Sequence, residues 1–303
     1  MTKRLLAFAA LALCATALRM TPLAQAQSAP APWSANLQDI RRAAGLIPGR
    51  RPLRVNFLKF AESRRTKNFS VKGAPTLPSV QARTAFQVVY PDGSVMVDAG
   101  MNLAVHKFFG RGTEEPYFPE ATKQIDQALQ KARLIVATHE HGDHVAGVIA
   151  SPLAGELAPK TVLTRAQIQT LMTSPQMPDI RLNAEQARRY VVVDYDTTFP
   201  LAPGMALLKS AGHTPGSQMV YIVLESGREY LLIGDATWHM DGVRDMIGKD
   251  APWITEDTAA VLAQLTWLNG LSRTEPGLVV VASHDDEQHA ALIQRGVLTN
   301  RLE

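Results

Sequence analysis

A cluster of histidines and one aspartate in the stretch Thr-His-Glu-His-Gly-Asp-His constrains this chain more than any other feature. The stretch directly follows Leu134–Ala137, an apolar run with the length of a buried strand. Because side chains alternate along an extended segment, we expect His139 and His141 to point the same way. The glycine allows a turn, after which Asp143 and His144 can begin a helix. The pattern therefore predicts four ligand-type side chains around one point.

The residue types of this cluster indicate a metal site. Imidazole nitrogens and a carboxylate suit Zn²⁺ or a similar divalent ion. A polar helix start with incidental histidines is the alternative interpretation. Three histidines and one aspartate within six residues rarely coincide without a metal, so we favour the metal site.

Four more candidate residues lie at the ends of apolar runs elsewhere in the chain. Asp98 ends one such run, and His213 lies in the turn Gly-His-Thr-Pro-Gly. Asp235 follows an Ile-Gly pair, and His284 comes shortly after another apolar run. Each of these residues is weak evidence alone, because a single histidine is more often structural than a ligand. Asp98 could equally be an ordinary turn aspartate.

Strand and helix patterns alternate along the chain, which indicates a layered α/β domain. Hairpin chemistry links two pairs of strands, through Pro-Asp-Gly and through Ser-Gly. We expect Thr255 to cap a helix with acidic residues in its first turn. The expected strands are 86–90, 94–98, 134–137, 161–163, 190–193, 219–224, 230–233 and 278–282, and the other expected helices are 120–132, 166–172 and 287–292.

The first 26 residues have the three parts of a secretory signal: a basic start, an apolar run and an Ala-Gln-Ala end. The apolar run, Leu5–Leu18, is too short to span a membrane. An N-terminal membrane anchor is the first alternative, although Arg19 interrupts the run. A lipid anchor at Cys14 is the second, although Leu13 stands where a small residue is needed.

We therefore expect a cleaved signal at residues 1–26, an Ala/Pro linker at 27–32 and a single domain at 33–303, located in the periplasm or secreted without stable membrane insertion. Cleavage removes three of the 31 basic residues, which leaves 28 basic and 28 acidic residues. The basic pI is then no indication of a nucleic-acid partner. Cleavage also removes the only cysteine, so the mature chain has no thiolate for catalysis or metal binding.

The segment from His139 to His144 resembles the HxHxDH signature of the metallo-β-lactamase superfamily. The later candidates His213, Asp235 and His284 stand in the order of that family's ligands. The resemblance implies a four-layer αββα sandwich over nearly all of the mature chain. It also implies two Zn²⁺ ions, although other divalent metals are possible.

In the implied ligand set, each metal takes three side chains of its own and both share Asp235. The resemblance places one metal on His139, His141 and His213 and the other on Asp143, His144 and His284. A carboxylate between two nearby cations offsets their repulsion. Asp98 would hydrogen-bond a ligand histidine.

The implied reaction is hydrolysis of a small-molecule substrate by a hydroxide that bridges the metals, with Asp143 relaying the proton to the leaving group. The lactone and ester hydrolases of the superfamily keep all seven ligands, so we expect an exported hydrolase that opens a lactone or a related carboxylic ester. The alternatives are a β-lactamase acting on β-lactam amides and a thioesterase of the glyoxalase type. A noncatalytic metal-binding protein that reuses the fold is a further alternative from a different class.

Four residues are candidates for lining the substrate site: Trp238, His239, Phe108 and Phe109. Trp238 stands where related lactonases have a tyrosine, and it could contact substrate or simply pack. We expect His239 to be a surface histidine rather than a donor near the metals. Phe108 and Phe109 lie in a segment that resembles a mobile flap, and core packing is the alternative for them.

Three further expectations concern charged and polar residues. Glu140, between two candidate ligands, should point away from the metals. His289 should face solvent from the last helix. The run Arg64, Arg65 and Lys67 should form a solvated loop, although it could steer an anionic substrate.

Overall fold

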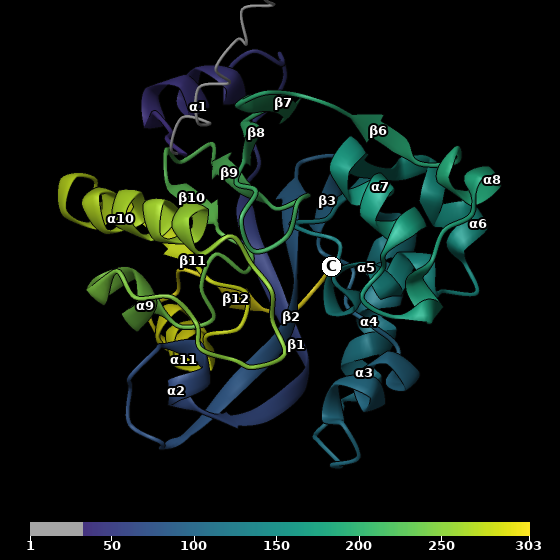
Figure 1. Cartoon of the computed structure of the whole chain (residues 1–303). Coiled ribbons are helices and arrows are strands. Elements are labelled where there is room, and N and C mark those ends of the chain that lie inside the picture. The colour runs from purple at the N-terminus through teal and green to yellow at the C-terminus, as the bar shows by residue number, and fades with distance from the viewer. Residues whose placement is uncertain (1–32) are drawn as a thin grey trace, which may run out of the picture. The chain divides into compact units, whose positions relative to one another are not determined.

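The computed structural model describes residues 33–303 and contains two β-sheets (Figure 1). The larger sheet has seven strands in the order β12 (Thr299–Asn300), β1 (Arg54–Thr66), β2 (Pro78–Tyr90), β3 (Gly93–Val97), β4 (Leu134–Val136), β5 (Thr161–Thr164) and β6 (Val191–Val193). The smaller sheet has five, in the order β11 (Leu278–Val281), β10 (Glu229–Leu232), β9 (Gln218–Val223), β8 (Met205–Lys209) and β7 (Thr198–Ala202). The expected signal and linker, residues 1–32, lie outside the described residues.

Helices cover the outer faces of both sheets (Figure 1). The larger sheet is covered by α3 (Leu103–Gly110), α4 (Pro119–Lys131), α5 (Gly142–Ile149), α6 (Ala154–Leu157), α7 (Arg165–Thr173) and α8 (Ala184–Ala187), with the 3₁₀ turns η1 (Ala158–Lys160) and η2 (Pro178–Ile180) among them. The smaller sheet is covered by α1 (Leu37–Ala44) and α10 (Thr258–Thr274). The other helices are α2 (Lys67–Ser70), α9 (Met240–Asp245) and α11 (Asp286–Gln294).

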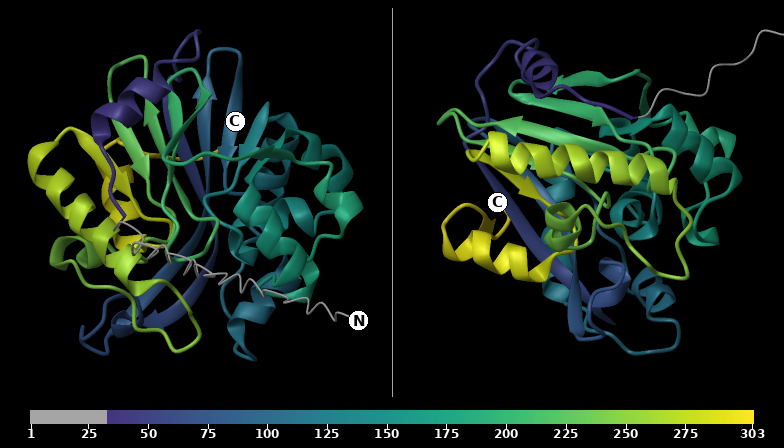
Figure 2. Two further views of the ribbon diagram at one scale, coloured as in Figure 1. Left: turned by 45° about the horizontal axis from the view of Figure 1, so that its top comes forward. Right: turned by 60° about the vertical axis from the view of Figure 1, so that its left-hand side comes forward.

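Three apolar cores separate these layers. The central core lies between the sheets, where Val88 of β2 and Val220 of β9 are fully buried. A second core packs the helices from α3 to α8 against the larger sheet, and a third packs α1 and α10 against the smaller one. The views in Figure 2 show this helix–sheet–sheet–helix arrangement. The expected αββα sandwich is therefore confirmed.

The sequence patterns predicted most strands of both sheets and missed others. The expected strands from 86–90 to 278–282 correspond to β2, β3, β4, β5, β6, β9, β10 and β11, and the expected helices correspond to α4, α7, α10 and α11. The long strand β1 was not predicted, and neither were α1, β7 and β8. In β1 the burial pattern is nearly continuous, with a bulge between Lys59 and Ala61, so it lacks the clean alternation that marks a half-buried strand.

Two expectations about local structure were wrong. Asp257, not Thr255, caps α10, because its carboxylate accepts a hydrogen bond from the Ala260 amide at 3.0 Å. The basic run is not a solvated loop, because Arg64 and Arg65 belong to β1. Among residues 33–303, no helix is long and apolar enough to cross a membrane.

The start of α5 is held against the loop that follows β3. The Ala99 amide donates to the His144 carbonyl at 2.7 Å, and the Gly147 amide donates to the Gly100 carbonyl at 2.8 Å. A Cβ atom on Gly147 would lie 1.9 Å from the Ala99 carbonyl oxygen, so the helix can approach this closely only with glycine there. The contact fixes α5, and with it the side chains of its first turn.

Candidate metal centre

The seven predicted ligands come from four segments that meet at one edge of the two sheets. His139 and His141 lie between β4 and α5, and Asp143 lies in the first turn of that helix beside His144. His213 lies between β8 and β9. The other two, Asp235 and His284, lie just after β10 and β11. The αββα topology therefore brings together residues that are up to 145 positions apart in sequence.

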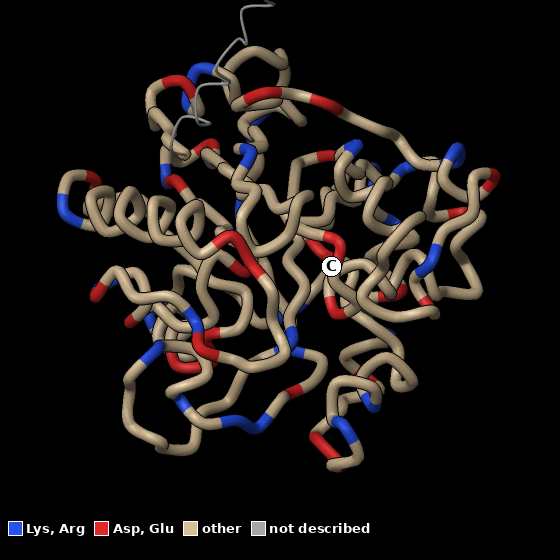
Figure 3. The backbone as a smooth tube through the Cα atoms, viewed as in Figure 1, with Lys and Arg blue, Asp and Glu red and all other residues tan. Residues whose placement is uncertain are grey.

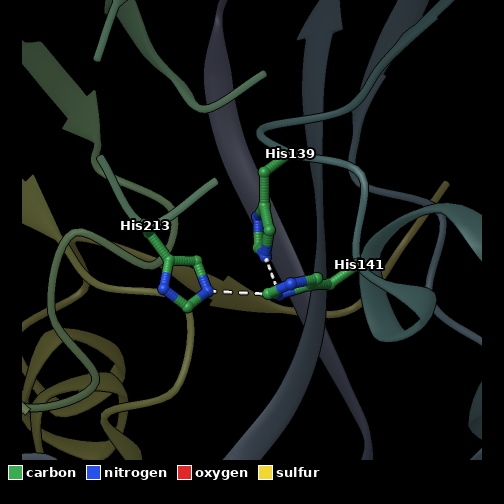
Figure 4. Close-up of side chains that lie close together, drawn as sticks. All are labelled: His139, His141 and His213. Atoms are coloured by element: carbon green, nitrogen blue, oxygen red, sulfur yellow. Dashed lines mark hydrogen bonds between the residues drawn. The ribbon is translucent and has the colours of Figure 1, made fainter. Parts of the chain in front are cut away.

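Three histidines form one group of converging nitrogens (Figure 4). The Nδ1 atom of His141 lies 3.1 Å from the Nε2 atom of His139. It also lies 3.1 Å from the Nε2 atom of His213. The three nitrogens therefore point at a common centre, which is the arrangement that a tetrahedral zinc ion needs from three of its ligands.

A second group lies beside the first and contains Asp143, His144 and His284. The Nε2 atoms of the two histidines are 3.3 Å apart, and each lies 3.4 Å from Asp143 Oδ2. Asp235 stands between the groups: its Oδ1 lies 3.1 Å from the His284 Nε2, and its Oδ2 lies 3.4 Å from the His213 Nε2. Its carboxylate thus faces both groups.

Three of these histidines use their second ring nitrogen for an outward contact. The Nδ1 of His144 donates to Asp98 Oδ2 at 2.8 Å, and the Nδ1 of His284 donates to the Ala82 carbonyl at 2.6 Å. The Nδ1 of His213 donates to Glu256 Oε2 at 3.0 Å. These contacts fix the ring orientations and leave a lone pair on each Nε2 that faces the centre.

This chemistry fits a pair of divalent cations. Burial lowers the pKa of His141 to about 3, and it also lowers the pKa of His139 and of His213, so these rings are neutral at pH 7. Neutral rings whose inward nitrogens carry lone pairs cannot hydrogen-bond one another at 3.1 Å, the separation within this group of three. A cation between them removes the repulsion. One buried oxygen of Asp235 also has no hydrogen-bond partner within residues 33–303, as expected of a ligand atom.

Asp98 holds its place through several hydrogen bonds. Besides His144, its carboxylate accepts from the Thr138 amide at 2.7 Å and from the Thr138 hydroxyl at 3.0 Å. Its backbone has a φ of 63°, a left-handed conformation that a non-glycine residue adopts only at a cost. Asp98 therefore acts on the centre by orienting His144.

Two buried residues that the sequence did not single out support the other side of the centre. The Lys249 side chain is fully buried, and its Nζ donates to the Asp235 carbonyl at 2.7 Å. The same Nζ lies 3.1 Å from Glu256 Oε2. Although burial opposes ionisation, the hydrogen bond from His213 and the charge of Lys249 lower the pKa of Glu256. Lys249 thus ties the Asp235 loop to the carboxylate that orients His213.

Glu140 points away from the centre, as predicted. Its carboxylate accepts from the Thr214 hydroxyl at 2.8 Å and from the Gly216 amide at 3.1 Å. A Cβ atom at Gly216 would lie 2.5 Å from that carboxylate, so glycine is required for this approach. Glu140 therefore joins the loop of His139 and His141 to the loop of His213.

A cavity of about 380 Å³ opens above the metal centre. Its floor includes His141, Asp143 and Asp235. Aromatic side chains form much of the wall: Phe69, Phe108, Phe109, Trp238 and Trp253. Phe108 and Phe109 therefore line the cavity, and Trp238 lies against the floor, where its indole N–H donates to Asp235 Oδ2 at 2.7 Å.

Two histidines lie differently from what the sequence suggested. His239 is buried rather than on the surface and is not among the residues that line this cavity. Its Nδ1 accepts from the Asp241 amide at 3.0 Å and so caps α9. His289 is also buried, because α11 packs it against Phe57 and its Nε2 donates to the Ala282 carbonyl at 2.8 Å. Neither role leaves a signal in the sequence.

Comparison with known proteins defines the class of this fold and site. The sequence matches the Metallo-beta-lactamase superfamily over residues 80–284, a range that contains every residue of the metal centre. The chain belongs to this superfamily.

Within the superfamily, the chain is a lactonase-like, metal-dependent hydrolase. It is 25% identical over 211 residues to an N-acyl homoserine lactonase of Bacillus cereus. The matched region covers 65% of this chain and 78% of that protein. Its fold resembles that of an N-acyl homoserine lactone hydrolase, whose structure has the product N-hexanoyl-L-homoserine bound at the catalytic metal centre. The TM-score is 0.63 and the sequence identity 18%, and the match covers 80% of this chain and 96% of the other. It also resembles AidC, a dizinc quorum-quenching lactonase, with a TM-score of 0.58 and 13% identity over 78% of this chain and 91% of the other.

Proposed function

We propose that this protein is an exported dinuclear zinc hydrolase that opens a lactone or a related carboxylic ester. The observation that carries the proposal is the convergence of seven His and Asp side chains at one centre, where three of them line the cavity above it. The lactonase relatives support the substrate class.

In this proposal each residue group has a defined role. His139, His141 and His213 would hold one ion and Asp143, His144 and His284 the other, and the Asp235 carboxylate faces both groups. When bound, the ions supply Lewis acidity for the substrate carbonyl and lower the pKa of a water molecule towards about 7.

The other side chains position these groups and handle the proton. Burial opposes ionisation of Asp143, but the charge of Arg83 and contacts to His144 hold the pKa of Asp143 well below its usual range. Its carboxylate is therefore ionised at pH 7, and we assign to it the transfer of the proton from the attacking water to the leaving group. The phenyl rings of Phe108 and Phe109 form an apolar side of the cavity wall.

A panel of matched substrates tests the reaction. The protein, loaded with zinc, is assayed on a γ-lactone, an N-acyl homoserine lactone, an aryl ester, a thioester and a β-lactam, each with and without chelator. We expect chelator-sensitive hydrolysis of a lactone or the ester. Hydrolysis of the β-lactam or the thioester alone would contradict the substrate class, and inactivity towards all five would contradict a carboxylic-ester hydrolase.

Export is tested separately, by expressing the full chain in a Gram-negative host and sequencing the N-terminus of the protein in the periplasmic fraction. We expect a chain that begins at residue 27. An uncleaved chain in the cytoplasm or the membrane would contradict export by this signal.

A further inference from the structure

The wall of the cavity above the metal centre contains three arginines, Arg65, Arg83 and Arg111. The acidic residues that line it are Asp143 and Asp235, which both belong to the metal centre. With two divalent cations in place, those two carboxylates are more than neutralised. The cavity is therefore strongly electropositive, and such a cleft concentrates anions.

Two of the arginines have partners within the protein. Arg83 pairs with Asp143, and its Nη2 donates to the Ser63 hydroxyl at 2.9 Å. Arg65 pairs with buried Glu115 and also donates to a backbone carbonyl, that of Phe109, at 3.0 Å. Both side chains are therefore held in place as parts of the wall.

Arg111 differs from them. Its guanidinium makes no hydrogen bond or ion pair with any residue between 33 and 303, and it lies over the ring of Trp253 at 5.0 Å from the centroid. Arg65 approaches the same ring at 5.9 Å, so two guanidinium groups flank one indole at the cavity wall. In Figure 3, basic positions of the lower part of β1 and of the turn after α3 lie on the same lower side of the molecule.

The backbone conformation of Arg111 is a second, independent indication that this side chain has a function. The residue follows α3 in the left-handed conformation, with φ of 50° and ψ of 42°, between Gly110 and Gly112. Glycine or asparagine is favoured at this position of a helix end, and an arginine there is strained. At this strained position, the chain has an arginine whose side chain lines the cavity with unused hydrogen-bond donors.

We propose that the substrate carries an oxyanionic group such as a carboxylate, which Arg111 binds beside Trp253, assisted by the charge of Arg65. The inference rests on the proposed ester or lactone hydrolysis and adds the chemical class of the substrate. Guanidinium donors bind carboxylates in a paired, planar geometry, and the neighbouring Phe108 and Trp253 rings accommodate the apolar part of the molecule.

Two lactones that differ in charge test this inference. The first is γ-butyrolactone-γ-carboxylate and the second is its primary amide, which has nearly the same shape and no charge. With the zinc-loaded protein we expect kcat/KM to be at least about tenfold higher for the carboxylate, and we expect the preference to shrink as salt increases.

Arg111→Gln should remove most of this preference by lowering kcat/KM for the carboxylate about tenfold while leaving the amide unchanged. Arg111→Lys, which keeps the charge, should restore part of it. The matched control is Arg188→Gln, because Arg188 is an exposed arginine at the end of α8, outside the residues that line the cavity.

The outcomes separate this inference from the proposed function. If both lactones are hydrolysed equally well, or if Arg111→Gln leaves the preference intact, the assignment of an anionic substrate is wrong and the hydrolase proposal stands. If neither lactone is hydrolysed and the ester panel is also negative, the hydrolase proposal fails first.

Discussion

The floor and the wall of the cavity are built in different ways. The floor belongs to the metal centre, whose ligands are held by neighbouring side chains: His144 by Asp98 and His213 by Glu256. The wall contains side chains with few constraints, such as half-exposed Phe108 and Arg111. The difference indicates that the floor performs chemistry that tolerates little displacement, whereas the wall selects what reaches it.

The largest effect is expected from a change in the floor. Asp235→Asn keeps the shape of the side chain but removes the negative charge between the two groups of ligands. We expect kcat/KM to fall on the order of a thousandfold and the zinc content to fall below two ions per chain. Elemental analysis and a lactone assay measure both effects. Asp194→Asn, on the exposed surface, is the control, and retention of two zinc ions with full activity would show that Asp235 does not lie between them.

A change at a residue that contacts a ligand, rather than at a ligand itself, should lower zinc binding less. Glu256→Gln keeps an acceptor for His213 but loses the charge that also pairs with Lys249. We expect zinc affinity, measured by competition with a chromophoric chelator, to fall by about tenfold to a hundredfold. Glu185→Gln on the exposed surface of α8 should leave it unchanged. Equal zinc affinity in both variants would show that Glu256 does not stabilise the metal centre.

The pH dependence of stability is expected to depend in part on His289, which lies away from the metal centre. Burial lowers the pKa of His289 to about 4, below its usual 6.5. The unfolded chain therefore binds this proton more tightly, so the stabilising contribution is complete above pH 6.5 and is lost as the pH falls towards 4.

His289→Gln retains a donor for the Ala282 carbonyl but cannot titrate. In urea titrations of the metal-free protein, its stability should fall less steeply over this range, by up to about 1.4 kcal/mol per pH unit relative to the parent chain. If the free energies of unfolding of the two proteins depend on pH in the same way, His289 does not contribute to acid sensitivity.

The smallest effect is expected at the wall. Phe108→Ala removes a half-exposed ring from the cavity, so KM for an apolar substrate should rise several-fold while kcat changes little. The free energy of unfolding should stay within about 0.5 kcal/mol of the parent value. A loss of kcat comparable to that of Asp235→Asn would abolish the distinction between floor and wall.

The sequence predicted the floor well because its residues are tied to regular patterns. His139 and His141 follow a buried strand, and Asp235 and His284 follow two more, so strand patterns place each of them at a strand end, and the resemblance to the superfamily groups them into one centre. The spacing of the motif also predicted that α5 begins near Asp143.

The supporting contacts could not be predicted in this way. Lys249 and Glu256 lie in an irregular segment before α10, and their contacts depend on tertiary packing that has no periodic signal. Arg83 was hidden inside a long strand, and Arg111 in a short turn between two glycines. His239 and His289 show the same limit, since a histidine in a polar stretch gives no sign of being buried.

Anomalous diffraction at the zinc absorption edge, from crystals of the zinc-loaded protein, tests the metal centre most directly. We predict two peaks per chain, one among His139, His141 and His213 and the other among Asp143, His144 and His284, separated by about 3.5–4 Å. A single peak, or zinc bound only at the surface, would contradict the account.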